Sequence, residues 1–188
     1  MNNSDLQRIK SWGVVFAWVG LIYSTLYIVK PICVFLKKNT PFDLLVNSGL
    51  AGLFILIAVL FFKKITIRKI STYFMLLFVF IAYLISLKAI QYPEEKLHLL
   101  EYGFLAFLCY KALSHDFDKA RVYIAGFILT SIFGILDEVI QYFIPNRHCQ
   151  ISDMALNSIS GALALFLIYI IQREKPIVSV VPPRIDTE

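Results

Sequence analysis

The sequence predicts an all-α protein, a polytopic transmembrane helical bundle of about six spans with both termini in the cytoplasm. Apolar residues make up 59% of the chain and the mean hydropathy is +0.72. Charged residues make up only 16%, whereas soluble domains average about 25%. A chain of 188 residues forms one domain with too little interior to bury so much apolar surface. The composition therefore excludes a soluble globular domain, a disordered chain and a nucleic-acid-binding module.

Six continuous apolar runs approach or exceed the roughly 20 residues that a helix needs to cross a membrane. They are Trp12–Leu36, Leu44–Phe62, Ser71–Leu87, Leu97–Ser114, Val122–Ile144 and Ser152–Ile171. The third and fourth runs are short and must extend into their flanks. The runs are continuous rather than alternating, which argues against β-strands. We expect residues 1–171 to form a single transmembrane domain and residues 172–188 to form a flexible cytoplasmic tail.

The basic residues lie between the apolar runs, so the net charge of +5 reports membrane topology rather than nucleic-acid binding. With six spans, twelve of the 18 Lys and Arg residues fall on the side of the termini and six on the other. Because positive loops stay in the cytoplasm, this difference places both termini inside. Losing one of the two short spans would place the C-terminus outside.

Carboxylates occur within the last three runs, where ionised groups are unfavourable. A charged side chain at the centre of the bilayer costs about 2.5–3.5 kcal/mol. We therefore expect four carboxylates to face other helices or a cavity rather than lipid: Glu101, Asp137, Glu138 and Asp153. A rise of 1.5 Å per residue places Glu101, Glu138 and Asn157 about 6–9 Å below the predicted outer surface. This layer predicts a polar pocket open to the outer leaflet.

Helical spacing brings several of these residues onto shared faces. His98 and Glu101 are three residues apart, and Asp153 and Asn157 are four apart. The candidate catalytic residues are His98, Glu101 and Glu138. The candidate substrate-binding residues are Lys96, Tyr102, Asp137, Gln141, Arg147, Asp153 and Asn157.

Three segments resemble the VanZ-like family of bacterial membrane proteins. They are E-K-L-H-L-L-E-Y-G-F-L at residues 95–105, D-E-V-I-Q-Y-F-I-P-N-R at residues 137–147, and D-x-x-x-N-x-x-x-G from Asp153 to Gly161. The resemblance covers about residues 94–167, and one residue separates Lys96 from His98 where many members have two. The name-giving member is associated with low-level teicoplanin resistance. The resemblance implies a role in the cell envelope and an influence on susceptibility to lipoglycopeptides of the teicoplanin type.

Two functional hypotheses use the same residues. In the first, an enzyme acts on a lipid or lipid-linked headgroup, with His98 as general base assisted by Glu101 or Glu138. Carboxylates with His98 are also compatible with a divalent cation, without selecting Mn²⁺, Zn²⁺ or Mg²⁺. In the second, a non-catalytic binding or transport-accessory protein holds the headgroup of a membrane lipid or lipid-linked cell-wall precursor, a lipid carrier or an amphiphilic antibiotic, and Arg147 and Lys96 attract its anion. The sequence leaves open catalysis, the ligand, any metal and the oligomeric state.

A structural role is the alternative to both. Asn157 and Gln141 are suited to interhelical hydrogen bonds, which contribute about 0.6 kcal/mol on average in membranes. Such bonds do not offset the cost of placing Glu101 and Glu138 in a membrane. The sequence therefore favours function for the cluster.

Overall fold

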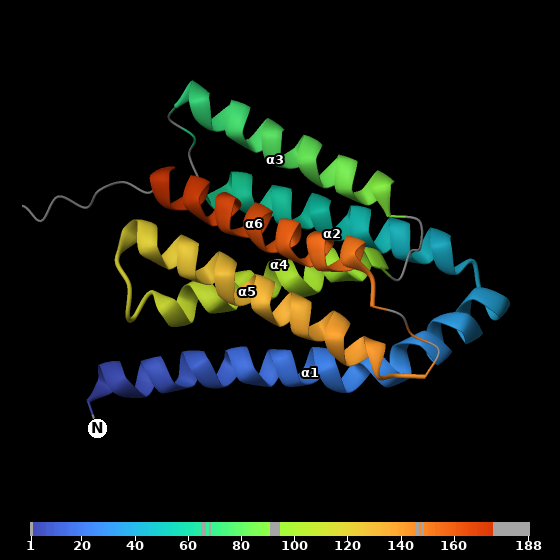
Figure 1. The fold of residues 1–188 in the computed structure, drawn as a ribbon. Helices are drawn as coiled ribbons and strands as arrows, with labels where there is room; N and C mark the ends of the chain where they lie inside the picture. Colours follow the sequence, from blue (N-terminus) through green and yellow to red (C-terminus); the bar gives the residue numbers. More distant parts are fainter. Residues whose placement is uncertain are drawn as a thin grey trace, which may run out of the picture.

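The computed structural model describes residues 2–64, 67, 69–90, 95–145, 147 and 149–174. These residues form six helices and no strand, which confirms the predicted all-α class (Figure 1). The helices are α1 (Asn3–Asn39), α2 (Phe42–Lys64), α3 (Ile70–Ala89), α4 (Lys96–Leu113), α5 (Lys119–Tyr142) and α6 (Ile151–Glu174). Each predicted run corresponds to one helix.

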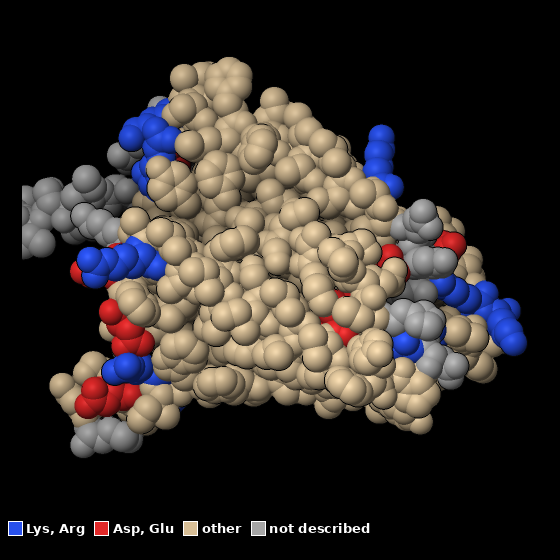
Figure 2. Space-filling model, in the orientation of Figure 1, with Lys and Arg blue, Asp and Glu red and all other residues tan. Residues whose placement is uncertain are grey.

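Five of the described helices, all except α4, are long and apolar enough to cross a membrane. Charged side chains gather toward the two ends of the bundle, and a broad uncharged band lies between them (Figure 2). Many large apolar side chains remain exposed, including Phe35 at 64%, Phe74 at 67% and Phe78 at 61%. Exposed apolar surface on this scale fits lipid rather than water. The chain is a multi-pass membrane protein.

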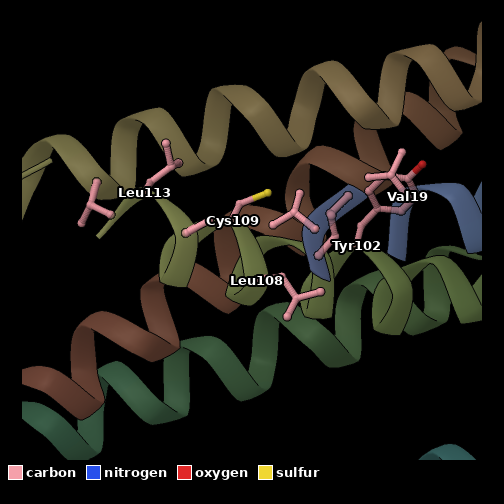
Figure 3. Packing of buried hydrophobic residues seen from close by; sticks show 9 residues of the cluster. Val19, Tyr102, Leu108, Cys109 and Leu113 are labelled. Carbon is pink, nitrogen blue, oxygen red and sulfur yellow. The ribbon is translucent and has the colours of Figure 1, made fainter. Parts of the chain in front are cut away.

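The short helix α4 lies at the centre, in contact with α1, α5 and α6. Its 18 residues give a length of about 27 Å at 1.5 Å per residue. Tyr102, Leu105 and Cys109 are fully buried and belong to the main apolar cluster with Val19 of α1 (Figure 3). Because α4 packs against three other helices, polar groups at its start can face those helices instead of acyl chains.

Helix α1 is longer than the predicted run Trp12–Leu36 at both ends. The Asn2 side chain caps its start and Asp5 completes a capping box, so the polar segment before Trp12 is also helical. Pro31 lies inside the helix, and Figure 1 shows α1 changing direction toward its C-terminal end. A proline removes a backbone donor and bends a helix, which accounts for this change.

Two glycines let α5 and α6 approach closely. A Cβ atom on Gly134 would lie 2.7 Å from the Asn157 Cβ, and one on Gly161 would lie 2.9 Å from the Thr130 Cγ2. Small residues at helix crossings are typical of membrane interfaces. The contact fixes the rotation of α5 against α6 and directs Asn157 toward the α5 backbone.

The start of α1 and the end of α6 lie at one end of the bundle, which we call the terminal end (Figure 1). Helix α6 includes Gln172, Arg173 and Glu174, so the expected tail does not begin at Gln172. The remaining tail residues, 175–188, lie outside the described part of the chain. The cytoplasmic placement of the termini stays a prediction.

Candidate functional site

A cavity of about 480 Å³ lies at the opposite end of the bundle, which we call the cavity end. Helix α1 forms one wall, and α4 contributes His98 and Glu101. The end of α5 and the segment before α6 contribute Gln141, Arg147 and Gln150, with Asp153 from the first turn of α6. Three predicted elements of the site therefore meet at a single cavity.

His98 lies between two carboxylates. Its Nδ1 atom is 3.6 Å from Glu101 Oε2 and 3.9 Å from Asp137 Oδ2. The His98 ring also stacks on Tyr102, with ring centroids 6.1 Å apart. The spacing on α4 thus brings His98 and Glu101 together as expected, and α5 adds Asp137 to the same group.

Asp137 is fully buried; the Tyr102 and Gln141 side chains are close enough to interact with its carboxylate, but no well-formed hydrogen bond to either oxygen is found among the described residues. Burying a carboxylate without a compensating partner is costly, because the charged form loses its hydration. Structural hydrogen bonding therefore does not explain why an acidic residue lies here.

Glu138, adjacent to Asp137 in the chain, makes well-defined hydrogen bonds. Gln141 Nε2 donates to Glu138 Oε1 at 3.1 Å, and the Gln150 backbone N–H donates to Glu138 Oε2 at 3.0 Å. These bonds tie the segment before α6 to the end of α5. The two neighbouring carboxylates thus have different surroundings, one bonded to amides and one without partners.

Arg147 links this segment to α1. Its Nη1 atom donates to Gln141 Oε1 at 3.1 Å, and its Nη2 atom donates to the Leu26 carbonyl at 3.1 Å. Leu26 lies in the stretch of α1 preceding Pro31, where helix bending makes carbonyl groups accessible to other donors. The guanidinium group is therefore held by two neutral acceptors from different elements.

Asp153 accepts only from neutral donors among the described residues. Gln150 Nε2 and Ser152 Oγ each lie 3.3 Å from one of its carboxylate oxygens. Its position in the first turn of α6 also favours a negative charge, because the helix dipole is positive there.

Two predicted binding residues lie deeper than the cavity wall. Asn157 is fully buried and its Nδ2 atom donates to the Gly134 carbonyl at 3.4 Å. The Tyr102 hydroxyl donates to the Phe133 carbonyl at 3.5 Å. Both side chains join α5 to its neighbours beneath the cavity.

Lys96 is directed to a different part of the molecule. Its Nζ atom donates to Asn47 Oδ1 of α2 at 2.8 Å, and it is not among the residues that line the described cavity. The structure therefore does not bring Lys96 together with His98 and Arg147.

Sequence reasoning did not anticipate the part played by α1. Thr25, Leu26, Lys30 and Cys33 line the cavity, although the first apolar run contributed nothing to the predicted site. Tyr23, which lies two residues before Thr25 in α1, donates to the Phe133 carbonyl at 2.8 Å and joins α1 to α5. The polar residues and the proline inside this long apolar run are the signal that could have revealed it.

The arrangement supplies hydrogen-bond acceptors, a guanidinium group and an imidazole at one surface, which suits binding or proton transfer. No group of three or more His, Cys, Asp or Glu residues within the described chain is arranged to hold a metal ion. The sequence left a divalent cation open, and the geometry of these residues adds no support for one.

Together, the fold and the site define a multi-pass helical membrane protein with a polar cavity at one end of the bundle. The VanZ/LLP1 family model matches residues 15–172, and the chain belongs to this family. The match begins well before the motif region 94–167, so it includes most of α1 and all of α2 and α3. No curated protein and no solved structure matches the chain.

Proposed function

We propose that this protein binds the polar headgroup of a membrane amphiphile in its cavity, on the extracytoplasmic face. Through that binding, it alters the susceptibility of the cell envelope to lipoglycopeptides of the teicoplanin type. The observation that carries the proposal is a cavity of about 480 Å³ beside a buried carboxylate, Asp137, whose oxygens accept no well-formed hydrogen bond from the described residues.

The size and the lining of the cavity support a headgroup rather than an ion alone. Ligand pockets commonly have volumes of about 300–1,000 Å³, with a few polar groups at defined positions. Here Glu101 lines the cavity with its side chain 33% exposed, so an incoming group can reach it. Apolar residues of α1, including Ile22 and Val29, complete the wall and offer contact to a carbon chain.

The distribution of basic residues supports the proposed extracytoplasmic placement of the cavity. The side of the membrane that holds the termini carries twice as many Lys and Arg residues as the other in a six-span arrangement, and positive loops stay in the cytoplasm. The cavity lies at the end away from the termini. Amphiphilic drugs that act on the cell wall act at that same face.

The proposal is tested by producing the chain in a susceptible bacterium and measuring the minimal inhibitory concentration of teicoplanin. We expect the wild-type chain to raise it and Glu101→Gln to abolish the rise at equal membrane abundance. Lys10→Gln, an exposed change at the terminal end, serves as the control and should behave as the wild type. Equal resistance with Glu101→Gln and the wild type would contradict a role for the cavity.

A second candidate is an enzyme that acts on the bound headgroup. The observation in its favour is the position of His98 Nδ1, 3.6 Å from Glu101 Oε2 and 3.9 Å from Asp137 Oδ2, because carboxylates orient a histidine for proton transfer. Purified protein incubated with an envelope lipid extract would then convert a lipid, as seen by mass spectrometry. His98→Gln should stop conversion while lipid binding persists, whereas the absence of conversion by the wild type leaves the binding function.

A further inference from the structure

Arg147 and Glu101 both line the cavity, and the structure does not pair these two charged side chains with each other. Arg147 donates to the Gln141 amide and the Leu26 carbonyl, both neutral, and its Nε atom has no partner. Asp137, Glu138 and Asp153 are close enough to interact with its charge, but no direct ion pair joins Arg147 to a carboxylate among the described residues. A guanidinium group held in this way keeps its positive charge available to an anion at the cavity wall.

The opposite charge collects on the α4 and α5 side. Glu101 lines the cavity, and its Oε2 atom lies 3.6 Å from the His98 Nδ1 atom. Asp137 lies behind His98, fully buried and without a hydrogen-bond partner in the described part of the chain. Acceptors therefore predominate on this side, and Lys96, the lysine at the start of α4, is turned toward Asn47 instead.

A separated positive and negative group in a poorly hydrated site is unfavourable until each meets an opposite charge. A ligand with only an anion compensates Arg147 and leaves Glu101 and Asp137 uncompensated. A ligand that carries a primary ammonium beside a phosphate or carboxylate compensates both sides. An ammonium group also supplies three donors, which match the free carboxylate oxygens.

We propose that the cavity recognises a zwitterionic group, with its primary ammonium toward Glu101 and its anion toward Arg147. This inference rests on the proposed headgroup-binding function and names the ligand class. Asp137 is fully buried next to His98, and its negative charge adds to the attraction of the site for an ammonium group. Such a zwitterion occurs on an aminophospholipid and on a soluble phosphoethanolamine ester, and the experiment separates these two sources.

The test is native mass spectrometry of the purified full-length protein in detergent, titrated with phosphatidylethanolamine, its N-acetyl derivative and phosphatidylglycerol. N-acetylation removes the ammonium charge and retains the phosphate. Because charge-assisted hydrogen bonds are among the stronger ones, we expect phosphatidylethanolamine to bind about tenfold more tightly than either other lipid. If soluble glycerophosphoethanolamine competes with the lipid, the cavity recognises the zwitterionic group on a soluble molecule as well. If it does not compete, the natural ligand is a lipid that carries this group.

Two variants test the ammonium-binding side and the anion-binding side of the cavity separately. Glu101→Gln should remove the preference for the ammonium-bearing lipid, while Arg147→Lys should weaken all three lipids and retain the preference, since lysine lacks the planar fork. Lys10→Gln should bind as the wild type. Equal or tighter binding of phosphatidylglycerol by the wild type would overturn the zwitterion and leave headgroup binding intact. Binding of none of these lipids would overturn both proposals.

Discussion

The two ends of the bundle use their polar residues differently. At the terminal end, Arg8 pairs with Asp116 at 2.8 Å, and the Thr72 hydroxyl donates to the Glu174 carboxylate. At the cavity end, Arg147 is bonded to neutral groups and Asp137 has no hydrogen-bond partner among the described residues. These two polar pairs at the terminal end thus join complementary groups directly, whereas Arg147 and Asp137 at the cavity make no direct bond to an opposite charge closer than 3.9 Å among the described residues.

This difference separates structural from functional polar residues. Thr72 and Glu174 are both buried, and their bond joins the start of α3 to the end of α6, so fold stability is sufficient to explain them. Asp137 is also buried, but the loss of its hydration is not offset by a well-formed hydrogen bond within the described chain. Strain of this kind in a packed protein points to a ligand that completes the site.

The largest effect expected is an all-or-none difference in chemical accessibility between the two ends. Cys149 is exposed near the cavity, whereas Cys33 and Cys109 are buried. A membrane-impermeant maleimide should therefore label the wild-type chain on intact cells and fail to label Cys149→Ser. In the Cys149→Ser background, Ser114→Cys at the exposed end of α4 should react only after permeabilisation. The opposite pattern would place the cavity in the cytoplasm.

An intermediate effect is expected from paired substitutions that remove one polar interaction at each end. Thr72→Val removes the hydroxyl that donates to Glu174 and should lower the free energy of unfolding by about 1–3 kcal/mol. Asp137→Asn replaces an unpartnered carboxylate with a neutral group of similar shape, so stability should be unchanged or higher.

Thermal unfolding in detergent, together with lipid titration, measures both changes. Asp137→Asn should reduce binding of phosphatidylethanolamine although it does not destabilise the fold, while Thr72→Val should bind normally below its lower melting temperature. A strongly destabilised Asp137→Asn would mean that this carboxylate supports the fold, and the contrast between the ends would fail.

The helices could be read from the sequence because apolar runs and their polar ends are local features. The fourth predicted run, Leu97–Ser114, differs from α4 by one residue at each end. The greater length of α1 was also encoded, in the capping pair Asn2 and Asp5, but hydropathy alone does not detect a polar helical extension. Local patterns thus determine which residues are helical.

The arrangement of the site depended on contacts that no local pattern specifies. Spacing on α4 placed His98 with Glu101, but only the packing of α5 places Asp137 within 3.9 Å of His98. That packing depends on Gly134, where an added Cβ would lie 2.7 Å from Asn157. The polar residues and the proline of α1 could have marked it as a candidate wall, but they do not specify which helices it packs against, so the sequence alone could not place Thr25 at the cavity.

The smallest effect expected is at the exposed ion pair of the terminal end. The Arg8 side chain is 55% exposed and that of Asp116 is 21% exposed, so water competes for both charges. Exposed pairs of this kind contribute about 0–1 kcal/mol. A double-mutant cycle with Arg8→Gln and Asp116→Asn, followed by thermal unfolding, should give a coupling energy in this range, reduced further by salt. Lys10→Gln provides the control for a change of net charge on the same helix. A coupling energy well above that range would show that this ion pair contributes substantially to the free energy of unfolding. The presence or absence of a charged partner would then no longer separate the two ends of the bundle.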